Sequence, residues 1–168
     1  LNAVVALRDR DEAVREADRV SSDGPFAGLP LVVKDNHDVA GMRTTYGSAL
    51  FADASPAETD ALVVERLRGA GAIVVGKTNL PEMAFAGFTD NVVFGPTRNP
   101  WGTEWSPGGS SGGAGAALAA GLAPLATATD GGGSVRIPAA FCGLVGLKPT
   151  NGLVARRPIH SWMDLSTD

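Results

Sequence analysis

The sequence has little cysteine, few aromatic residues and no long hydrophobic run. Its single cysteine, Cys142, excludes an internal disulfide, and no Cys/His spacing of the zinc-binding kind occurs, so we expect no metal and no other cofactor. The apolar neighbours of Cys142 indicate a small buried side chain. The smoothest apolar stretch, residues 113–129, is rich in Ala and Gly and is interrupted by Pro124, so we expect no membrane span.

An excess of positive charge is also missing. The net charge is −4 and the Lys and Arg residues are scattered, which argues against a nucleic-acid partner. With 44% hydrophobic and 19% charged residues, the 168-residue chain is expected to be globular. It begins at Leu1 rather than Met, which suggests a fragment. We expect a cytoplasmic protein, while a targeting peptide ahead of Leu1 and a homo-oligomer stay open.

Short β-branched runs alternate with helical patterns along the chain, which predicts an α/β fold with a mixed, largely parallel central sheet flanked by helices. The carboxyl ends of such strands are where sites form, and Lys34, Asp130 and Ser134 fall at or just beyond them. Strands are expected at residues 31–35, 72–76, 124–130 and 144–149. Helices are expected at residues 10–20, from the Ser55–Glu58 capping box to residue 70, at residues 114–121, and from Ser134.

Two short segments match known motifs residue by residue, but the secondary structure expected around them does not fit those motifs. Residues 71–78, "GAIVVGKT", fit the phosphate-loop pattern, yet their middle residues indicate a buried strand, and Pro81 disfavours the helix that should follow. The pattern G-x-S-x-G occurs twice between residues 108 and 113, but no strand precedes it as a nucleophile elbow requires. Histidine partners are also scarce, because only His37 and His160 exist.

A serine can instead be activated by a lysine that has lost its proton. Lys34 follows the apolar run "LVV", where burial would favour the neutral amine, although an exposed lysine paired with a nearby Asp is the alternative. The loop "DGGGS", ending at Ser134, offers successive backbone N–H groups that can stabilise an oxyanion. A simple glycine turn with a capping serine is the other interpretation of that loop.

Longer segments of the chain resemble the amidase signature enzymes. The resemblance rests on "GGSSGGAGAALAAG" and "TDGGGSVRIPAAFCGLVGLKPT", and also on "GLPLVVKDNHDVAG", "GAIVVGKTN" and "GPTRNPW". It covers nearly the whole chain and implies that residues 1–168 are the amino-terminal part of a single amidase signature domain. Family members run to several hundred residues, so the chain would cover only the amino-terminal part of one.

The resemblance implies a Ser-Ser-Lys triad that hydrolyses a carbon–nitrogen bond of a small-molecule amide through an acyl-enzyme. Lys34 would be the base, Ser110 the bridging serine and Ser134 the nucleophile. The oxyanion-hole amides would come from Gly131, Gly132, Gly133 and Ser134. Supporting residues would be Gly109, which precedes Ser110 across a cis peptide bond, Ser111, and an Asp130–Arg136 anchor of the loop.

Three other functions compete with a stand-alone amidase. The glutaminase component of glutamyl-tRNA amidotransferase, its A subunit, uses the same triad to release ammonia from glutamine, but commonly has Gln where this chain has Ile137. A nucleotide-binding module would depend on residues 71–78 alone. An inactive scaffold is disfavoured because Lys34, Ser110 and Ser134 are all present.

Overall fold

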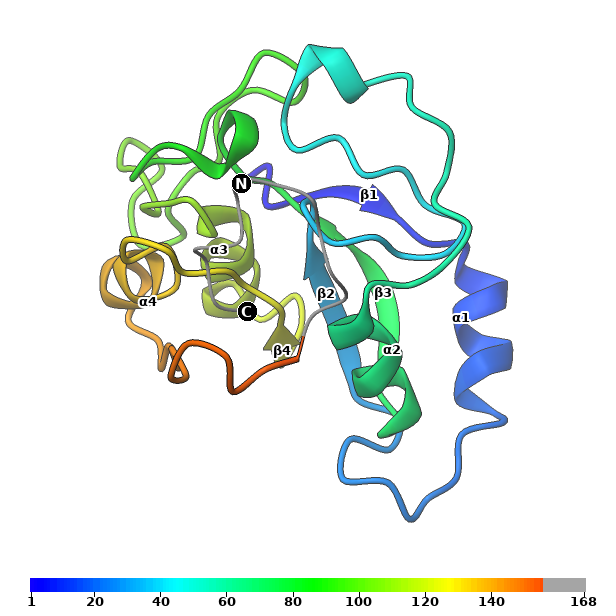
Figure 1. Cartoon of the computed structure of the whole chain (residues 1–168). Helices are drawn as coiled ribbons and strands as arrows, with labels where there is room; N and C mark the ends of the chain where they lie inside the picture. The colour runs from blue at the N-terminus through cyan, green and yellow to red at the C-terminus, as the bar shows by residue number, and fades with distance from the viewer. Residues whose placement is uncertain (156–168) are drawn as a thin grey trace.

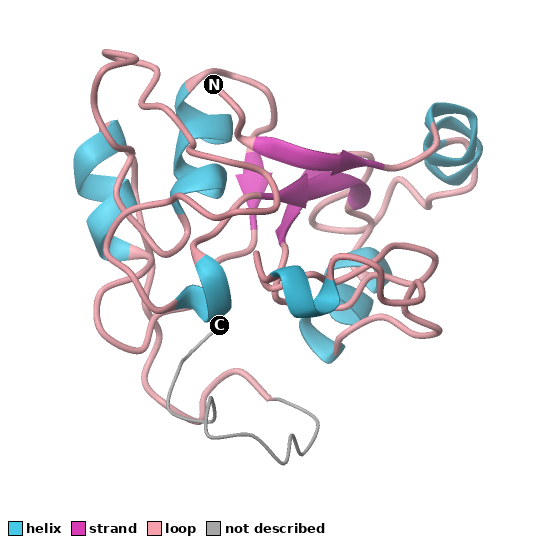
Figure 2. Cartoon of the chain, turned by 90° about the horizontal axis from the view of Figure 1, so that it is seen from above, coloured by secondary structure: helices cyan, strands magenta, loops and turns pink. Residues whose placement is uncertain are grey.

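The computed structural model describes residues 1–155. Four strands form one sheet in the order β1-β3-β2-β4, with helices and loops on either side (Figures 1 and 2). The strands are β1 (Val4–Leu7), β2 (Pro30–Lys34), β3 (Ile73–Thr78) and β4 (Leu125–Ala126). The helices are α1 (Arg10–Ala17), α2 (Leu62–Gly69), α3 (Gly112–Ala119) and α4 (Arg136–Cys142), with short 3-10 turns η1 (Ala49–Phe51) and η2 (Glu82–Ala84). β2 is parallel to β3 and β4, and β1 is antiparallel to β3, which confirms the predicted mixed α/β fold.

The sheet carries a separate core on each face, because neighbouring residues of a strand point to opposite sides. Leu31 and Val33 of β2 pack with Val64 of α2. Val32, which lies between them, packs in the other core with Ala116 of α3. β2 is therefore buried on both faces, which explains its unbroken apolar run. Among the described residues, no helix is both long and apolar enough to cross a membrane.

Small residues let α3 approach its neighbours closely, as the sequence predicts. A β-carbon on Gly113 would lie 2.3 Å from the backbone nitrogen of Asn79. A β-carbon on Gly115 would lie 3.1 Å from Pro138 and 3.4 Å from the sulfur of Cys142, both on α4. Cys142 is buried, as predicted. α3 and α4 thus form a tightly packed pair, and the loops that precede both helices are held together.

α2 begins later than predicted. The Ser-Pro segment that resembles a capping box is not helical, and the first helical residue is Leu62. Its backbone is used elsewhere: the N–H of Ala57 donates to the carbonyl of Met42. The carboxylate of Asp60 accepts from the N–H of Ala40. Tertiary hydrogen bonds to the loop after β2 therefore replace the predicted first turns of the helix.

Other predicted elements are shorter or absent. α1 ends at Ala17, before the predicted residue 20. Its Val14 is exposed, so the helix has no buried apolar face there. Glu16 of this helix instead forms ion pairs with Arg8 and Arg68. β4 covers only two residues of the predicted 124–130 strand. Residues 144–149 form a loop in which Val145 is exposed, so that predicted strand is wrong. β1 was not predicted; its four residues form a strand only by pairing with β3.

Candidate active site

Lys34 ends the central strand β2 at the sheet edge that sequence analysis singled out. Its side chain is fully buried, with 0% of its surface exposed. The Nζ atom donates to the Oγ of Ser110 and to the Oγ1 of Thr129, each at 2.8 Å. The structure thus brings Lys34 into direct contact with the Gly/Ser loop before α3, and the alternative of an exposed lysine is wrong.

Ser110 and Ser111 lie on a loop tied to the glycine loop before α4. The peptide bond between Gly109 and Ser110 is cis, as the resemblance implies. The N–H of Ser111 donates to the carbonyl of Ser134 at 3.2 Å. The Oγ of Ser111 lies 3.4 Å from both the carbonyl oxygen and the amide nitrogen of Thr129. Ser111 therefore joins both sides of the site, in agreement with its predicted support of the loop.

Asp130 organises the glycine loop, as predicted. Its carboxylate accepts hydrogen bonds from the backbone N–H of Gly133 at 2.7 Å and of Val135 at 3.1 Å. The Nε and Nη2 atoms of Arg136 donate to the same carboxylate, each at 2.9 Å. Burial alone would raise the pKa of Asp130, but these hydrogen bonds outweigh it and hold that pKa well below its usual range. The carboxyl is therefore an ionised anchor for the loop.

Gly133 differs from its predicted role. Its N–H is directed at Asp130, so it anchors the loop instead of facing a bound substrate. The glycines that line the neighbouring cavity are Gly131 and Gly132, and both are exposed there. Of the four residues expected to form the oxyanion hole, Gly131, Gly132 and Ser134 line the cavity.

A cavity of about 460 Å³ opens beside these loops. Ser110 and Ser134, from separate loops, both line it. The other lining residues are Asn36, Met83, Ala84, Phe85, Ala86, Gly87, Gly109, Thr129, Gly131, Gly132 and Ile137. His37 is buried and does not line the cavity; its Nδ1 lies 3.3 Å from the Oγ1 of Thr127. His160 lies outside the described residues. The groups at this cavity are hydroxyls and backbone amides, and the buried Lys34 amine contacts Ser110, which lines it. This combination suits acyl transfer.

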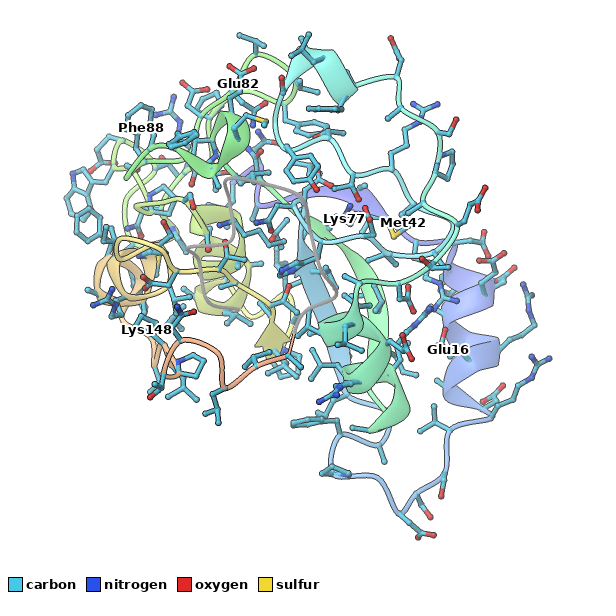
Figure 3. The ribbon with its side chains drawn as sticks, in the orientation of Figure 1. Glu16, Met42, Lys77, Glu82, Phe88 and Lys148 are labelled. Carbon is cyan, nitrogen blue, oxygen red and sulfur yellow. The ribbon has the colours of Figure 1, made fainter. Side chains whose placement is uncertain are left out.

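The phosphate-loop motif has a different role. Its residues form β3, and its lysine, Lys77, is fully buried inside the molecule (Figure 3). The Nζ of Lys77 lies 2.7 Å from the carboxylate of Asp35 and donates to Thr44 and to the carbonyl of Arg43. Burial lowers the pKa of Lys77, against the opposing effect of Asp35. No phosphate could reach this amine, so the nucleotide-binding alternative is wrong.

Thr129 and Asn36 belong to the site, although sequence analysis did not select them. The Oγ1 of Thr129 accepts from Lys34 and, at 3.2 Å, from the Nδ2 of Asn36. The sequence could have pointed to both residues. Asn36 lies two residues after Lys34 and Thr129 directly before Asp130, and both Lys34 and Asp130 were expected at this edge of the sheet. Short polar side chains beside a predicted site are thus candidates by proximity alone.

Comparisons with known proteins point to one family. The model of the Amidase family matches residues 2–168. The chain is 51% identical over 161 residues to an acylamidase of Rhodococcus erythropolis, covering 92% of this chain and 33% of that protein. It is 52% identical over 149 residues to a glutamyl-tRNA(Gln) amidotransferase component of Carboxydothermus hydrogenoformans, covering 89% of this chain and 30% of that protein.

A solved structure shares the fold as well. The 6-aminohexanoate cyclic dimer hydrolase, complexed with substrate, superposes with a TM-score of 0.91 at 43% identity. The match covers 98% of this chain and 34% of the hydrolase. The chain thus spans about a third of the length of the curated relatives it matches. Because a family model matches almost all of its residues, the chain belongs to the amidase signature family.

Proposed function

We propose that this chain carries the catalytic centre of an enzyme that hydrolyses a small-molecule amide. Ser134 is the nucleophile, Ser110 the bridging hydroxyl and Lys34 the base. The observation that carries the proposal is the 2.8 Å contact between the Nζ of Lys34 and the Oγ of Ser110, both buried beside the cavity that Ser134 lines. Burial disfavours the charged ammonium, as a lysine base requires.

The proposed reaction starts from a neutral Lys34. The Oγ of Ser134 attacks the amide carbonyl while its proton passes to Ser110, whose own proton passes to Lys34. The N–H groups of Gly131 and Gly132 stabilise the oxyanion that forms. As the intermediate collapses, the carbon–nitrogen bond breaks and the relay returns the proton to the departing amine. Water then hydrolyses the ester on Ser134, and no cofactor, nucleic acid or membrane takes part.

The test uses the full-length protein that contains this chain, with a panel of small amides. Ser134→Ala and Lys34→Ala should each remove nearly all turnover, because each removes a group that forms or breaks bonds. Ser55→Ala and Lys148→Ala are matched controls, since both residues lie away from the cavity. Near-normal turnover of either triad variant would refute the assignment.

A glutaminase that supplies ammonia to a partner protein is the second candidate, because a glutamyl-tRNA amidotransferase component is among the relatives. The side chain of Ile137, which lines the cavity, favours the stand-alone amidase, since glutamine would meet an apolar surface there. A glutaminase assay with and without an amidotransferase partner separates the two. Ammonia release from glutamine that requires the partner would support the second candidate.

A further inference from the structure

One wall of the cavity has an unusual backbone. Residues 83–87 line the same cavity as the glycine loop, and Met83 and Ala84 are both left-handed, with φ of 53° and 61°. Residues with a β-carbon avoid this region, and two in succession need support from their surroundings. Backbone of this kind is concentrated at functional sites. The contacts that hold this turn therefore shape the cavity.

Glu82, at the start of this turn, makes the first supporting contact. The Oγ of the buried Ser48 donates to the carboxylate of Glu82 at 2.6 Å. Figure 3 shows Glu82 on the η2 turn. Immediately after it, the N–H of Met83 donates to the carbonyl of Tyr46 at 2.8 Å. Two successive residues of the turn are thus bound to residues 46–48.

Residues 46–48 pack closely against the residues just before the turn, and they are hydrogen-bonded to the residue that follows Lys34 and strand β2. Gly47 has a φ of 63°, and a β-carbon there would lie 2.9 Å from the carbonyl of Leu80. The N–H of Tyr46 donates to the backbone carbonyl of Asp35, the residue after Lys34, at 3.1 Å. A continuous chain of contacts therefore leads from the proposed base to the cavity wall.

The wall also packs against the residue that precedes the bridging serine. A β-carbon on Gly109, the residue before Ser110, would lie 2.5 Å from the carbonyl of Phe88 and 2.8 Å from that of Ala86. The wall is thus held between the Gly109–Ser110 loop on one side and residues 46–48 on the other. A change in its position alters the space beside the nucleophile.

We propose that Glu82 is a positioning residue that sets which substrates Ser134 accepts. Through its hydrogen bond with Ser48, Glu82 holds the left-handed turn against the cavity. In this position, Met83–Gly87 contact a bulky, apolar group attached to the scissile carbonyl. This inference rests on the proposed function. Ser134, Gly131 and Gly132 belong to a different segment of the cavity lining from residues 83–87, so we expect a small acyl group to react without help from the wall.

The test compares two fluorophosphonates, one with a methyl group and one with a benzyl group on phosphorus, as labels of Ser134 in the full-length protein. Glu82→Ala should lower the ratio of benzyl to methyl labelling rates about three- to tenfold, as expected for the loss of one hydrogen bond. Ser48→Ala should lower it equally. Glu82→Gln keeps an acceptor oxygen and should restore the ratio, and Glu58→Ala, on the exposed surface, is the control.

The outcomes separate this inference from the proposed function. A wild-type protein that neither probe labels at Ser134 refutes the function itself. Labelling of the wild type with an unchanged ratio in Glu82→Ala overturns only the role of Glu82. Equal losses for both probes would also overturn it, because they would show a general disturbance of the site and not a selective one.

Discussion

The replacement Asp130→Asn removes the charge that organises the glycine loop while it keeps the size of the side chain. The carboxylate accepts from the backbone N–H groups of Gly133, Val135 and Arg136, and also from the side chain of Arg136. Asparagine offers only one acceptor oxygen, so at least one of these N–H groups loses its partner. Since a hydrogen bond to a charged group contributes about 1.5–3 kcal/mol, the free energy of unfolding should fall by about 2–3 kcal/mol.

Most of this loss should come from the backbone hydrogen bonds and not from the ion pair. The Arg136 side chain is 55% exposed, and exposed ion pairs contribute little. Arg136→Met should therefore destabilise the protein less than Asp130→Asn. Urea unfolding of the full-length protein measures both variants, with Asp53→Asn as the exposed control.

The same replacement should slow the chemistry. Asp130 holds the loop that carries the proposed oxyanion donors, so its replacement should displace them. The loss of one such donor typically lowers the rate about 10²–10³-fold, so the rate at which the methyl fluorophosphonate labels Ser134 should fall by about two orders of magnitude. A variant with wild-type stability and a wild-type labelling rate would contradict the anchoring role of Asp130.

The pH dependence has a definite sign. The pKa of Asp130 is held below its usual value of about 3.9 by its hydrogen-bond donors. The stabilisation is therefore complete above about pH 4 and is lost as the pH falls below that value. The wild type should lose stability more steeply than Asp130→Asn in this acid range, and parallel curves would refute the linkage.

Two further predictions concern packing. Gly113→Ala places a methyl group against the backbone of Asn79 and should lower the free energy of unfolding by about 2 kcal/mol or more. Gly69 has open space around it, so Gly69→Ala should raise the free energy of unfolding by up to about 1 kcal/mol. If urea unfolding shows that both replacements change this free energy in the same direction, the packing described here is contradicted. Lys77→Met leaves Asp35 buried without its cation and should cost about 3–5 kcal/mol, and ATP should not raise the melting temperature of the wild type. A loss below about 1 kcal/mol, or stabilisation by ATP, would contradict the structural role of Lys77.

Elements with strong local patterns could be predicted from the sequence. β2 is a β-branched run buried on both faces, and α3 is a small-residue helix after a Gly/Ser loop; both form where predicted. Lys34 lies at the sheet edge because it ends β2, and Asp130 holds its loop through neighbours close in sequence. In these cases the local preference and the tertiary structure agree.

The remaining differences have tertiary causes. The predicted start of α2 is wrong because the N–H of Ala57 donates a hydrogen bond to Met42 in the loop after β2, a contact between separate segments. β1 needs β3 as a partner, and the run at residues 144–149 has none among the described strands. Gly133 is a local exception: its N–H donates to Asp130, three residues earlier, although nothing in its residue type sets it apart from the other glycines of the loop. Local sequence carries no information about the pairings between separate segments.

The most direct test of the proposed centre is the site and rate of covalent labelling in the full-length protein. The methyl fluorophosphonate should label Ser134, identified by peptide mass spectrometry, and the rate should fall at least a hundredfold in Lys34→Ala and in Ser110→Ala. Labelling at another residue, or an unchanged rate without the amine of Lys34, would contradict the account.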